Sequence, residues 1–561
     1  MKKSSNILIP CLMLGLSAIT SCGNKKQQVE ETPVQKEAQA EIVTFPSANP
    51  FLAAGDYSSV HFGPAQTNTF SHSVKEHSYQ VYSKQLQDIL PVLMPSMILN
   101  ATADECYWVT DMGQAYYMTT KGDRWAKLAA ISLDGKAADT LRAVSIKAFA
   151  DSFYTTGAEM DKAVASLFGK DAKNSVENGR FPVVDKDNVL YTFFNRKLVG
   201  ITLADAQDPA KGLVIKSQLD LSKAIPANDR IVGMQMTYDG YLVVNSAKGV
   251  FCIIDRANLS IKNQMQVTPT QLFFAPVAVD DKNGIYAVSD SMMMKLVWNG
   301  TNLSVDEKEG AWSCPIKYDR DPELMKQGGG VLGAPVLMGF GNDPDKLVVI
   351  TDGASRTNLM AFWRDSIPAD AKMAAGASSK RVAGMINVTC GFNAQNMASY
   401  IQSYHSVPVM GYGAFVANTI NGYPVPTTPN DFALLGSILP TAKGVERFQW
   451  DYTKNEWISV WSAPTVGCSA MNPVISKQAK LILLNSFDSS NAVEGWSVKG
   501  YDWATGAYKN QVVFAADTQY GNGTCGYFQY LKDGDMIFNS IAGTYRLTFG
   551  EERGLNRSPR L

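Results

Sequence analysis

The chain has 561 residues, of which 45% are hydrophobic and 18% are charged, and its formal net charge is −1. A charge so close to zero creates no long-range field, so nucleic acid is excluded as a partner attracted by overall charge. The length exceeds one ordinary compact domain and suits either several domains or a closed ring of repeats. The sequence contains four histidines, which limits histidine-based metal or acid–base chemistry.

The first 21 residues have the features of a targeting segment. Lys2 and Lys3 precede an apolar run at residues 7–19, which is too short to span a bilayer. Residues 19–22, Ile-Thr-Ser-Cys, resemble the lipobox of bacterial lipoproteins. The resemblance implies removal of residues 1–21, palmitate-type lipid on Cys22, and anchoring to a membrane of the bacterial cell envelope, on its periplasmic or surface face. The alternative is an ordinary secretory signal followed by a cysteine that carries no lipid.

The segments at the two ends are predicted to lie outside the main fold. Residues 22–44 are rich in Lys, Gln and Glu, with few large apolar side chains. Such a segment buries too little surface to fold, so we predict a disordered tether. Residues 45–105 show no clear periodicity and are predicted to be an N-terminal extension packed on the main domain. Residues 551–561 are predicted to be a C-terminal tail.

Residues 231–267 contain the clearest local pattern, four short β-prone runs separated by three turns. Asp239-Gly240 suits a two-residue hairpin turn, because Gly adopts a positive φ at little cost and Asp tolerates it. The stretch is therefore predicted to form one antiparallel four-stranded sheet, the blade of a β-propeller. The predicted strands are residues 231–238, 241–245, 250–255 and 260–267.

The same order of strands and turns recurs along residues 106–550. Equivalent turns in successive copies occur at Asp187, Asp239, Asn283 and Asp345. One blade leaves an apolar face uncovered, and radial stacking against its neighbours buries that face. The predicted fold class is therefore all-β, a β-propeller of eight four-stranded blades. Seven blades with a separate N-terminal sheet are the alternative, because the copy that begins at Cys106 is the weakest.

One stretch interrupts this β pattern. Residues 148–176 carry large apolar side chains at helical spacing, including Met160 and Val164. A short helical insertion is therefore predicted near residues 148–176, between the first two copies. Residues 141–146, just before it, are predicted to be the last strand of the first copy.

Residues 501–506, Tyr-Asp-Trp-Ala-Thr-Gly, resemble the repeat of pyrroloquinoline-quinone-type propellers, and the strand spacing is similar to that of lactonase-like propellers. The resemblance covers most of residues 106–549 through short motifs, so it supports the fold and says little about activity. Quinone dehydrogenases of this fold commonly hold a disulfide of two adjacent cysteines against the cofactor. The sequence has no Cys-Cys pair, so pyrroloquinoline quinone is not the expected cofactor.

Three residues are candidates for a site at the central channel, where the inner strands of a propeller converge. His405 precedes the predicted inner strand of the sixth copy, Arg447 lies in that copy, and Asn472 begins the inner strand of the seventh. Histidine titrates near neutral pH. The competing interpretation makes His405 a hydrogen-bonded rim residue.

A calcium site is a further hypothesis. Lactonase-like propellers bind Ca²⁺ at the channel mouth through carboxylate and amide oxygens. The resemblance thus suggests that Asp185, Asp280, Asp352 and Asn472 converge. The competing interpretation is that the acids stabilise turns.

Two functions of different classes follow from these observations. The first is a membrane-anchored extracytoplasmic propeller that acts as a binding or scaffold module for a protein or a glycan. The second is an enzyme of lactonase, lyase or glycan-processing type at the channel mouth, with Ca²⁺ as a candidate cofactor. In both cases the site is expected where the inner strands meet.

Overall fold

The computed structural model divides the chain into two compact units, residues 1–33 and 34–561. All residues whose structure is described belong to the second unit. The signal segment, Cys22, most of the predicted tether and the C-terminal tail lie outside them. The described residues are 43–74, 78–81, 86, 88–92, 96–133, 139–152, 154–168, 177–318, 331, 333–393, 400–420, 442–468, 471–487, 495–514, 519–523, 526–541 and 543–548.

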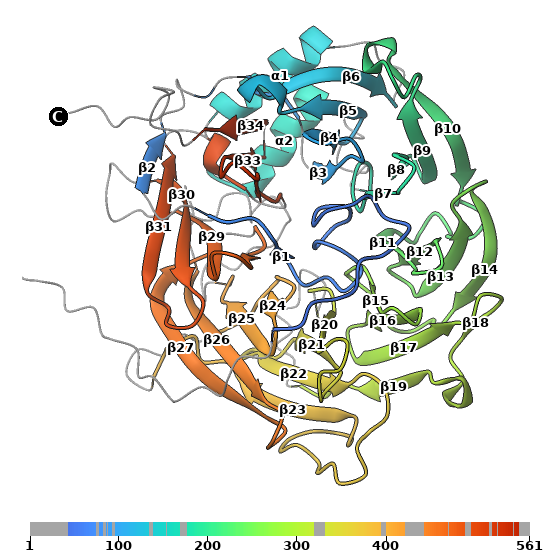
Figure 1. The fold of residues 1–561 in the computed structure, drawn as a ribbon, viewed down its shortest axis with the longest axis vertical. Helices are drawn as coiled ribbons and strands as arrows, with labels where there is room; N and C mark the ends of the chain where they lie inside the picture. Colours follow the sequence, from blue (N-terminus) through green and yellow to red (C-terminus); the bar gives the residue numbers. More distant parts are fainter. Residues whose placement is uncertain are drawn as a thin grey trace, which may run out of the picture. The chain divides into compact units, whose positions relative to one another are not determined.

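Eight sheets stand side by side in a ring, which confirms the predicted eight-bladed β-propeller (Figure 1). Within each blade the strands follow one another from the centre outwards in chain order, except that two strands from the N-terminal part of the chain are added at the edges of blade 7. The seven-blade alternative is wrong, because the weakest copy forms a four-stranded sheet, β3–β6, that stands in the ring as a blade. Blades 1 and 2 consist of β3 (Met97–Asn100), β4 (Cys106–Thr110), β5 (Gln114–Thr119), β6 (Ala126–Ser132), β7 (Val183–Val184), β8 (Leu190–Phe194), β9 (Lys197–Leu203) and β10 (Leu213–Asp220).

Blades 3 to 5 repeat this arrangement, and blade 4 has an additional strand paired with β17. Their strands are β11 (Ile231–Met236), β12 (Tyr241–Ser246), β13 (Val250–Asp255), β14 (Ser260–Gln266), β15 (Ala278–Val279), β16 (Gly284–Val288), β17 (Met292–Trp298), β18 (Leu303–Ser304), β19 (Trp312–Pro315), β20 (Val336–Met338), β21 (Leu347–Thr351), β22 (Asn358–Trp363) and β23 (Val382–Asn387).

Blades 6 to 8 close the ring. Their strands are β24 (Val409–Met410), β25 (Gly413–Ala417), β26 (Lys443–Asp451), β27 (Glu456–Gly467), β28 (Val474–Ser476), β29 (Leu481–Phe487), β30 (Trp496–Asp502), β31 (Tyr508–Phe514), β32 (Gln529–Tyr530), β33 (Met536–Asn539) and β34 (Thr544–Leu547).

Blade 3 shows why the local sequence adopts this form. Gly240 has a φ of 89°, the left-handed conformation that its turn needs. The second and third strands, β12 and β13, are buried along almost their whole length, because neighbouring blades cover both of their faces. The outer strand β14 alternates between half-buried and exposed side chains, as expected for the rim of the ring.

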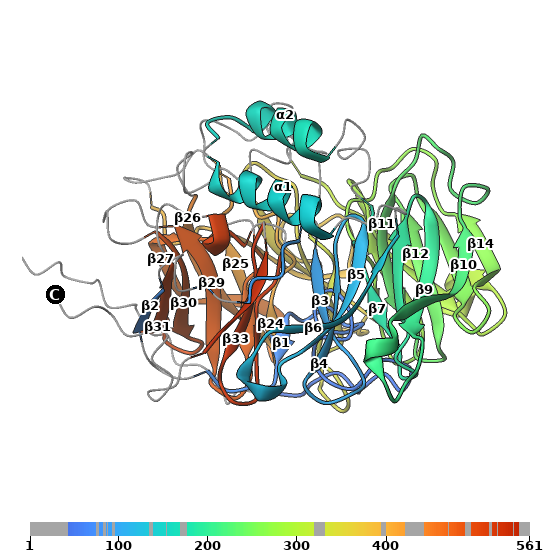
Figure 2. The same cartoon turned by 90° about the horizontal axis from the view of Figure 1, so that it is seen from above.

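Two α-helices separate blades 1 and 2, α1 (Asp139–Asp151) and α2 (Gly157–Phe168). Both lie on one face of the ring (Figure 2). The helical insertion is confirmed, but it begins earlier than predicted, and residues 169–176 are outside the described part. The prediction of a strand at residues 141–146 is wrong, because they lie within α1; the fourth strand of blade 1 is β6.

Closure of the ring combines the two ends of the chain. The C-terminal part of the chain supplies three strands of blade 8, and Leu90 pairs with Thr544 beside the last of them. In blade 7, β1 (Thr69–Phe70) pairs with the inner strand β28 and β2 (Ser78–Val81) pairs with the outer strand β31, both in parallel. Residues before position 106 thus protect sheet edges that would otherwise be open.

Tryptophan side chains connect neighbouring blades. The indole N–H of Trp298 in blade 4 donates to Asp239 in a turn of blade 3, at 2.9 Å. In the same way Trp450 of blade 6 donates to Asp345 of blade 5, at 2.7 Å. Both indoles are fully buried, so each bond satisfies a donor that would be costly to leave unpaired.

Candidate functional site

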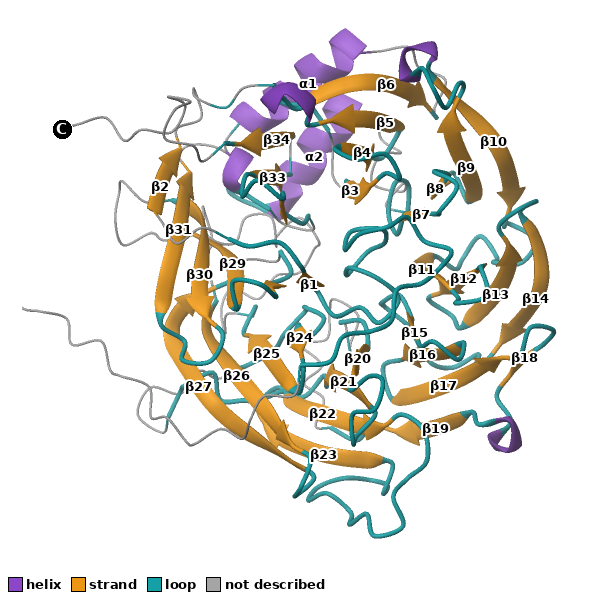
Figure 3. Cartoon of the chain, in the orientation of Figure 1, coloured by secondary structure: helices purple, strands orange, loops and turns teal. Residues whose placement is uncertain are grey.

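The middle of the ring is occupied by residues 49–70, which we call the central segment. Figure 3 shows it inside the circle of strands, as loop except for the short strand β1 (Thr69–Phe70) at its end. Its first part binds blade 2, where Ala53 N donates to Val184 O and Val184 N donates to Ser58 O, both at 2.9 Å. Residues 45–105 were predicted to pack on the ring, but the central segment, which is part of them, lies within it.

The rest of the central segment passes along the inner strands of four successive blades. In each, an inner-strand amide donates to a carbonyl oxygen of the segment, so backbone groups at the ring centre find partners within the chain. The donor–acceptor pairs are Val279–Pro64 in blade 4, Leu337–Ala65 in blade 5, Val409–Thr67 in blade 6, and Ile475–Asn68 and Lys477–Phe70 in blade 7, at 2.8 to 3.0 Å.

The backbone of the central segment adopts unusual conformations. Four residues other than glycine have a positive φ: His61 at 59°, Phe62 at 63°, Gln66 at 61° and Asn68 at 54°. Each costs about 1–3 kcal/mol and persists only where the surroundings fix it. The contacts with successive blades supply that constraint, so the inner strands hold the segment in a shape it would not adopt alone.

A buried polar cluster surrounds His61, whose side chain is 7% exposed. Its Nδ1 lies 3.0 Å from Asn68 Oδ1, an acceptor, so a neutral ring with hydrogen on Nδ1 donates there. The Tyr527 hydroxyl lies 3.1 Å from Nδ1, and Ser406 Oγ lies 3.5 Å from Nε2. The cluster thus joins the central segment to the connections that precede the inner strands of blades 6 and 8.

The structure brings two of the three predicted channel residues near this cluster. Asn472 Nδ2 donates to the Tyr527 hydroxyl at 3.2 Å. His405 is buried and directly precedes Ser406. Arg447 lies apart, between blades 6 and 7, where it donates to Gln449 at 2.7 Å and lies over the Trp503 ring at 4.9 Å.

The four residues of the calcium hypothesis are not brought together. Asp185 and Asp280 accept hydrogen bonds from backbone amides of their own turns and from Tyr191 and Tyr286, respectively. Asp352 likewise accepts from backbone and side-chain groups of its loop. Within the described ranges, no group of three or more His, Cys, Asp or Glu side chains is close enough to hold a metal ion.

Burial makes the charged form of His61 unfavourable and lowers its pKa from 6.5 to about 4. The folded protein therefore binds fewer protons than the unfolded chain between these values, and stability falls as the pH drops through that window. The expected loss between pH 7 and pH 4 is about 2–3 kcal/mol from this residue. Urea unfolding of the wild type and of His61→Asn, whose new side chain tolerates positive φ, measures it.

The variant should lose less stability on acidification than the wild type by about that amount. An identical pH dependence in both proteins would show that His61 does not stay neutral in the folded state. Carboxylates elsewhere contribute equally to both curves and cancel in the comparison.

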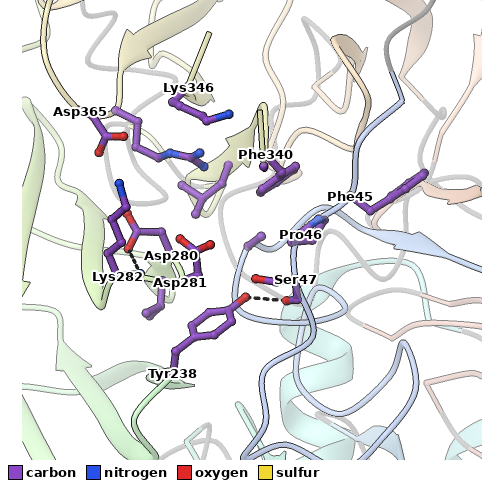
Figure 4. Close-up of a pocket in the computed structure, with 15 residues that line it drawn as sticks. Phe45, Pro46, Ser47, Tyr238, Asp280, Asp281, Lys282, Phe340, Lys346 and Asp365 are labelled. Carbon is purple, nitrogen blue, oxygen red and sulfur yellow. Dashed lines mark hydrogen bonds between the residues drawn. The ribbon is translucent and has the colours of Figure 1, made fainter. Parts of the chain in front are cut away.

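A second candidate is a cavity of about 220 Å³ between blades 4 and 5 (Figure 4). Phe45, Pro46 and Ser47, which precede the central segment, form one wall, and the Tyr238 hydroxyl donates to Ser47 O at 2.9 Å. Turns of the two blades supply most of the other walls. Its charged lining residues are Asp280, Asp281, Lys282, Lys346, Arg364 and Asp365.

Sequence reasoning did not single out His61 or Arg364. His61 lies in the part of the chain without periodicity, and the signal it did carry was the density of turn residues around Gly63, Pro64 and Asn68. Arg364 follows the apolar strand β22, where an arginine is expected to be solvated. Its burial depends on the turn of the same blade that folds over it.

Comparisons with known proteins add the following. No family model matches the chain. An uncharacterised protein of Archaeoglobus fulgidus is 28% identical over 331 aligned positions, and the match covers 56% of this chain and 60% of that protein. The chain thus spans about three fifths of the length of this curated relative.

Solved structures with a similar fold include the quinohemoprotein alcohol dehydrogenase of Comamonas testosteroni, with 9% identity, a TM-score of 0.47, and coverage of 89% of this chain and 81% of that one. A europium-containing methanol dehydrogenase has 9% identity, a TM-score of 0.49, and coverage of 87% and 90%. No activity is transferred from either. The order of its sheets makes this chain an eight-bladed β-propeller with the central segment inside the ring.

Proposed function

We propose that this chain is a lipoprotein, anchored through Cys22 to a membrane of a bacterial cell envelope, whose propeller is a binding or scaffold module for a protein or a glycan. The observation that carries the binding role is the central segment. The innermost strands of a propeller line its channel, and here those of blades 4 to 7 bind the chain's own backbone. The ring then offers its faces and the clefts between blades to partners.

The anchoring part of the proposal rests on the sequence of residues 1–44. Among the helices of the described residues, none is long and apolar enough to cross a membrane. Lipid on Cys22 supplies attachment of a different kind, with the polar residues after it as a spacer. A diacylated or triacylated cysteine carries at least two chains, which is enough for stable anchoring.

Replacement of Cys22 should release the protein from the membrane. Wild-type protein should partition into the detergent phase and yield an N-terminal peptide with the mass of lipid, whereas Cys22→Ser should give an aqueous protein without it. Cys11→Ser, a matched change within the apolar run of the signal, should behave as the wild type. A wild-type N-terminal peptide without lipid would overturn the anchoring proposal.

The binding role has its own test. Wild-type protein solubilised from the cell envelope should retain a protein or a glycan, and Cys22→Ser protein mixed with solubilised envelope should retain the same one, because the propeller makes the contact. Retention by neither protein would contradict the binding role. The metal-dependent enzyme alternative is tested separately: bound Ca²⁺ by elemental analysis together with a lower melting temperature in chelator would support it.

A further inference from the structure

The cavity between blades 4 and 5 contains a buried cation. Arg364 is 6% exposed, and its Nη2 donates to Gly339 O at 2.6 Å. Its guanidinium lies over the Phe340 ring at 5.4 Å. Nη1 is buried with no hydrogen-bond partner among the described residues, and no described carboxylate forms an ion pair with this arginine. A buried charge that makes no direct ion pair is expensive, so an anion in contact with Arg364 would be stabilised.

The acidic residues of the same cavity already have partners or face solvent. Asp280 accepts from two turn amides and from the Tyr286 hydroxyl. Asp365 pairs with Lys295 at 3.2 Å. Asp281 is exposed. None of them therefore neutralises Arg364 by direct contact. Burial raises the pKa of Asp365, but the charges of Lys295 and, more weakly, Arg364 lower it, and the pKa lies below its usual value.

Two further cations line the same cavity. Lys346 donates to Asp343 O at 2.9 Å and is half-buried, and Lys282 lines the opposite wall (Figure 4). Burial lowers the pKa of Lys346, Asp343 raises it, and the charge of Arg364 lowers it again. Lys346 and Arg364 therefore repel each other, and an anion between them would relieve that repulsion.

We propose that this cavity binds a small carboxylate, with Arg364 as its anchor and Lys346 and Lys282 as supporting cations. The planar guanidinium lies over Phe340, and its Nη1 has no partner among the described residues, so it keeps a donor for a carboxylate. A volume of about 220 Å³ is below the ~300 Å³ of pockets for drug-sized ligands, so the ligand is a small molecule. This inference rests on the proposed binding function and gives it a ligand class.

The ligand would also contact the segment that leads to the predicted anchor. Phe45, Pro46 and Ser47 line the cavity, and Thr44 Oγ1 donates to Asp343 at 2.6 Å beside it. The site is therefore built from blades 4 and 5, from Tyr238 of blade 3 and from the start of the described chain. A bound carboxylate should fasten these residues to the ring.

Purified full-length protein in detergent should bind N-acetylglycine but not N-acetylglycinamide, which differs only in lacking the carboxylate. We expect N-acetylglycine to raise the melting temperature in a saturable way at constant ionic strength, and calorimetric titration to give the same dissociation constant. Arg364→Gln should weaken binding at least about tenfold, because a charge-assisted bidentate contact is lost. Inorganic phosphate should bind more weakly than N-acetylglycine.

The matched control is Arg196→Gln, which removes a half-buried arginine of blade 2 that donates to Asp229 O at 2.9 Å, outside this cavity. It should bind N-acetylglycine as the wild type does. If Arg364→Gln does not fold, Lys346→Met at the rim should still show several-fold weaker binding. The inference is overturned if the wild type gives no saturable response, if Arg364→Gln responds equally, or if phosphate or the amide binds as well. These readouts need no membrane, so they are independent of the anchoring test.

Discussion

Deletion of residues 24–70 should abolish cooperative folding, whereas deletion of residues 24–42 should leave the melting temperature unchanged. The longer deletion removes the central segment, whose carbonyl oxygens accept from the inner strands of blades 4 to 7. Each buried backbone hydrogen bond contributes about 1 kcal/mol net, and its loss also leaves an amide unpaired. The bonds in blades 2 and 4 to 7 together approach the ~5–15 kcal/mol by which a protein is stable.

Both deletions keep Cys22, and they differ in residues 43–70, which are the central segment and the six residues before it. Circular dichroism and calorimetry during heating measure the outcome. A sharp transition at the wild-type temperature in the longer deletion would show that the ring is complete without the segment. In that case the segment would be an insert in a preformed channel, and the channel would return as the leading candidate for a site.

Replacement of Arg546 by methionine should destabilise the protein by about 3–5 kcal/mol, the cost of breaking a buried ion pair from one side. Arg546 in β34 is almost fully buried and pairs with Asp535 at 2.7 Å and with Asp533 at 2.6 Å. Its Nη1 also donates to Thr120 O of blade 1, at 2.7 Å. The residue thus joins blade 8 to blade 1, where the two ends of the chain close the ring.

The same junction offers a control. Lys532 pairs with Asp104 at 3.0 Å between the same two blades, but both side chains are 77% exposed. Lys532→Met should therefore cost no more than about 1 kcal/mol. Urea unfolding at equilibrium measures both variants. Equal effects of the two substitutions would mean that burial does not set the strength of this junction, and a stable Arg546→Met protein would mean that the closure depends on other contacts.

Much of the fold could be predicted because blades are local structures. Asp239-Gly240 needs only its neighbours in sequence to form a turn, and the runs on either side of it are too short for helices and too apolar for loops. Repetition of that unit then requires a ring. The helical insertion was recognised by its period, although residues 141–146 were assigned to a strand because a short apolar run does not distinguish the two structures.

The candidate sites could be predicted only in part. His405 and Asn472 lie four and two residues before the inner strands β24 and β28, close to the positions that the repeat predicts. His61 and its contact with Tyr527 join residues 466 positions apart, and no periodicity connects them. The acids Asp185 and Asp280 carry the signature of a turn and of a metal ligand equally well, and hydrogen bonds in three dimensions show the former.

The sequence by itself determined that the chain is a ring of antiparallel blades, because turn chemistry and alternating hydrophobicity act over a few residues. It also provides the lipobox-like motif on which the anchoring proposal depends. Only the tertiary structure decided that residues 49–70 fill the centre of the ring and that Arg364 is buried with no ion-pair partner among the residues that the structure describes. Both depend on which distant backbone and side-chain groups meet, and desolvation and hydrogen bonding act on a group only after those neighbours are in place.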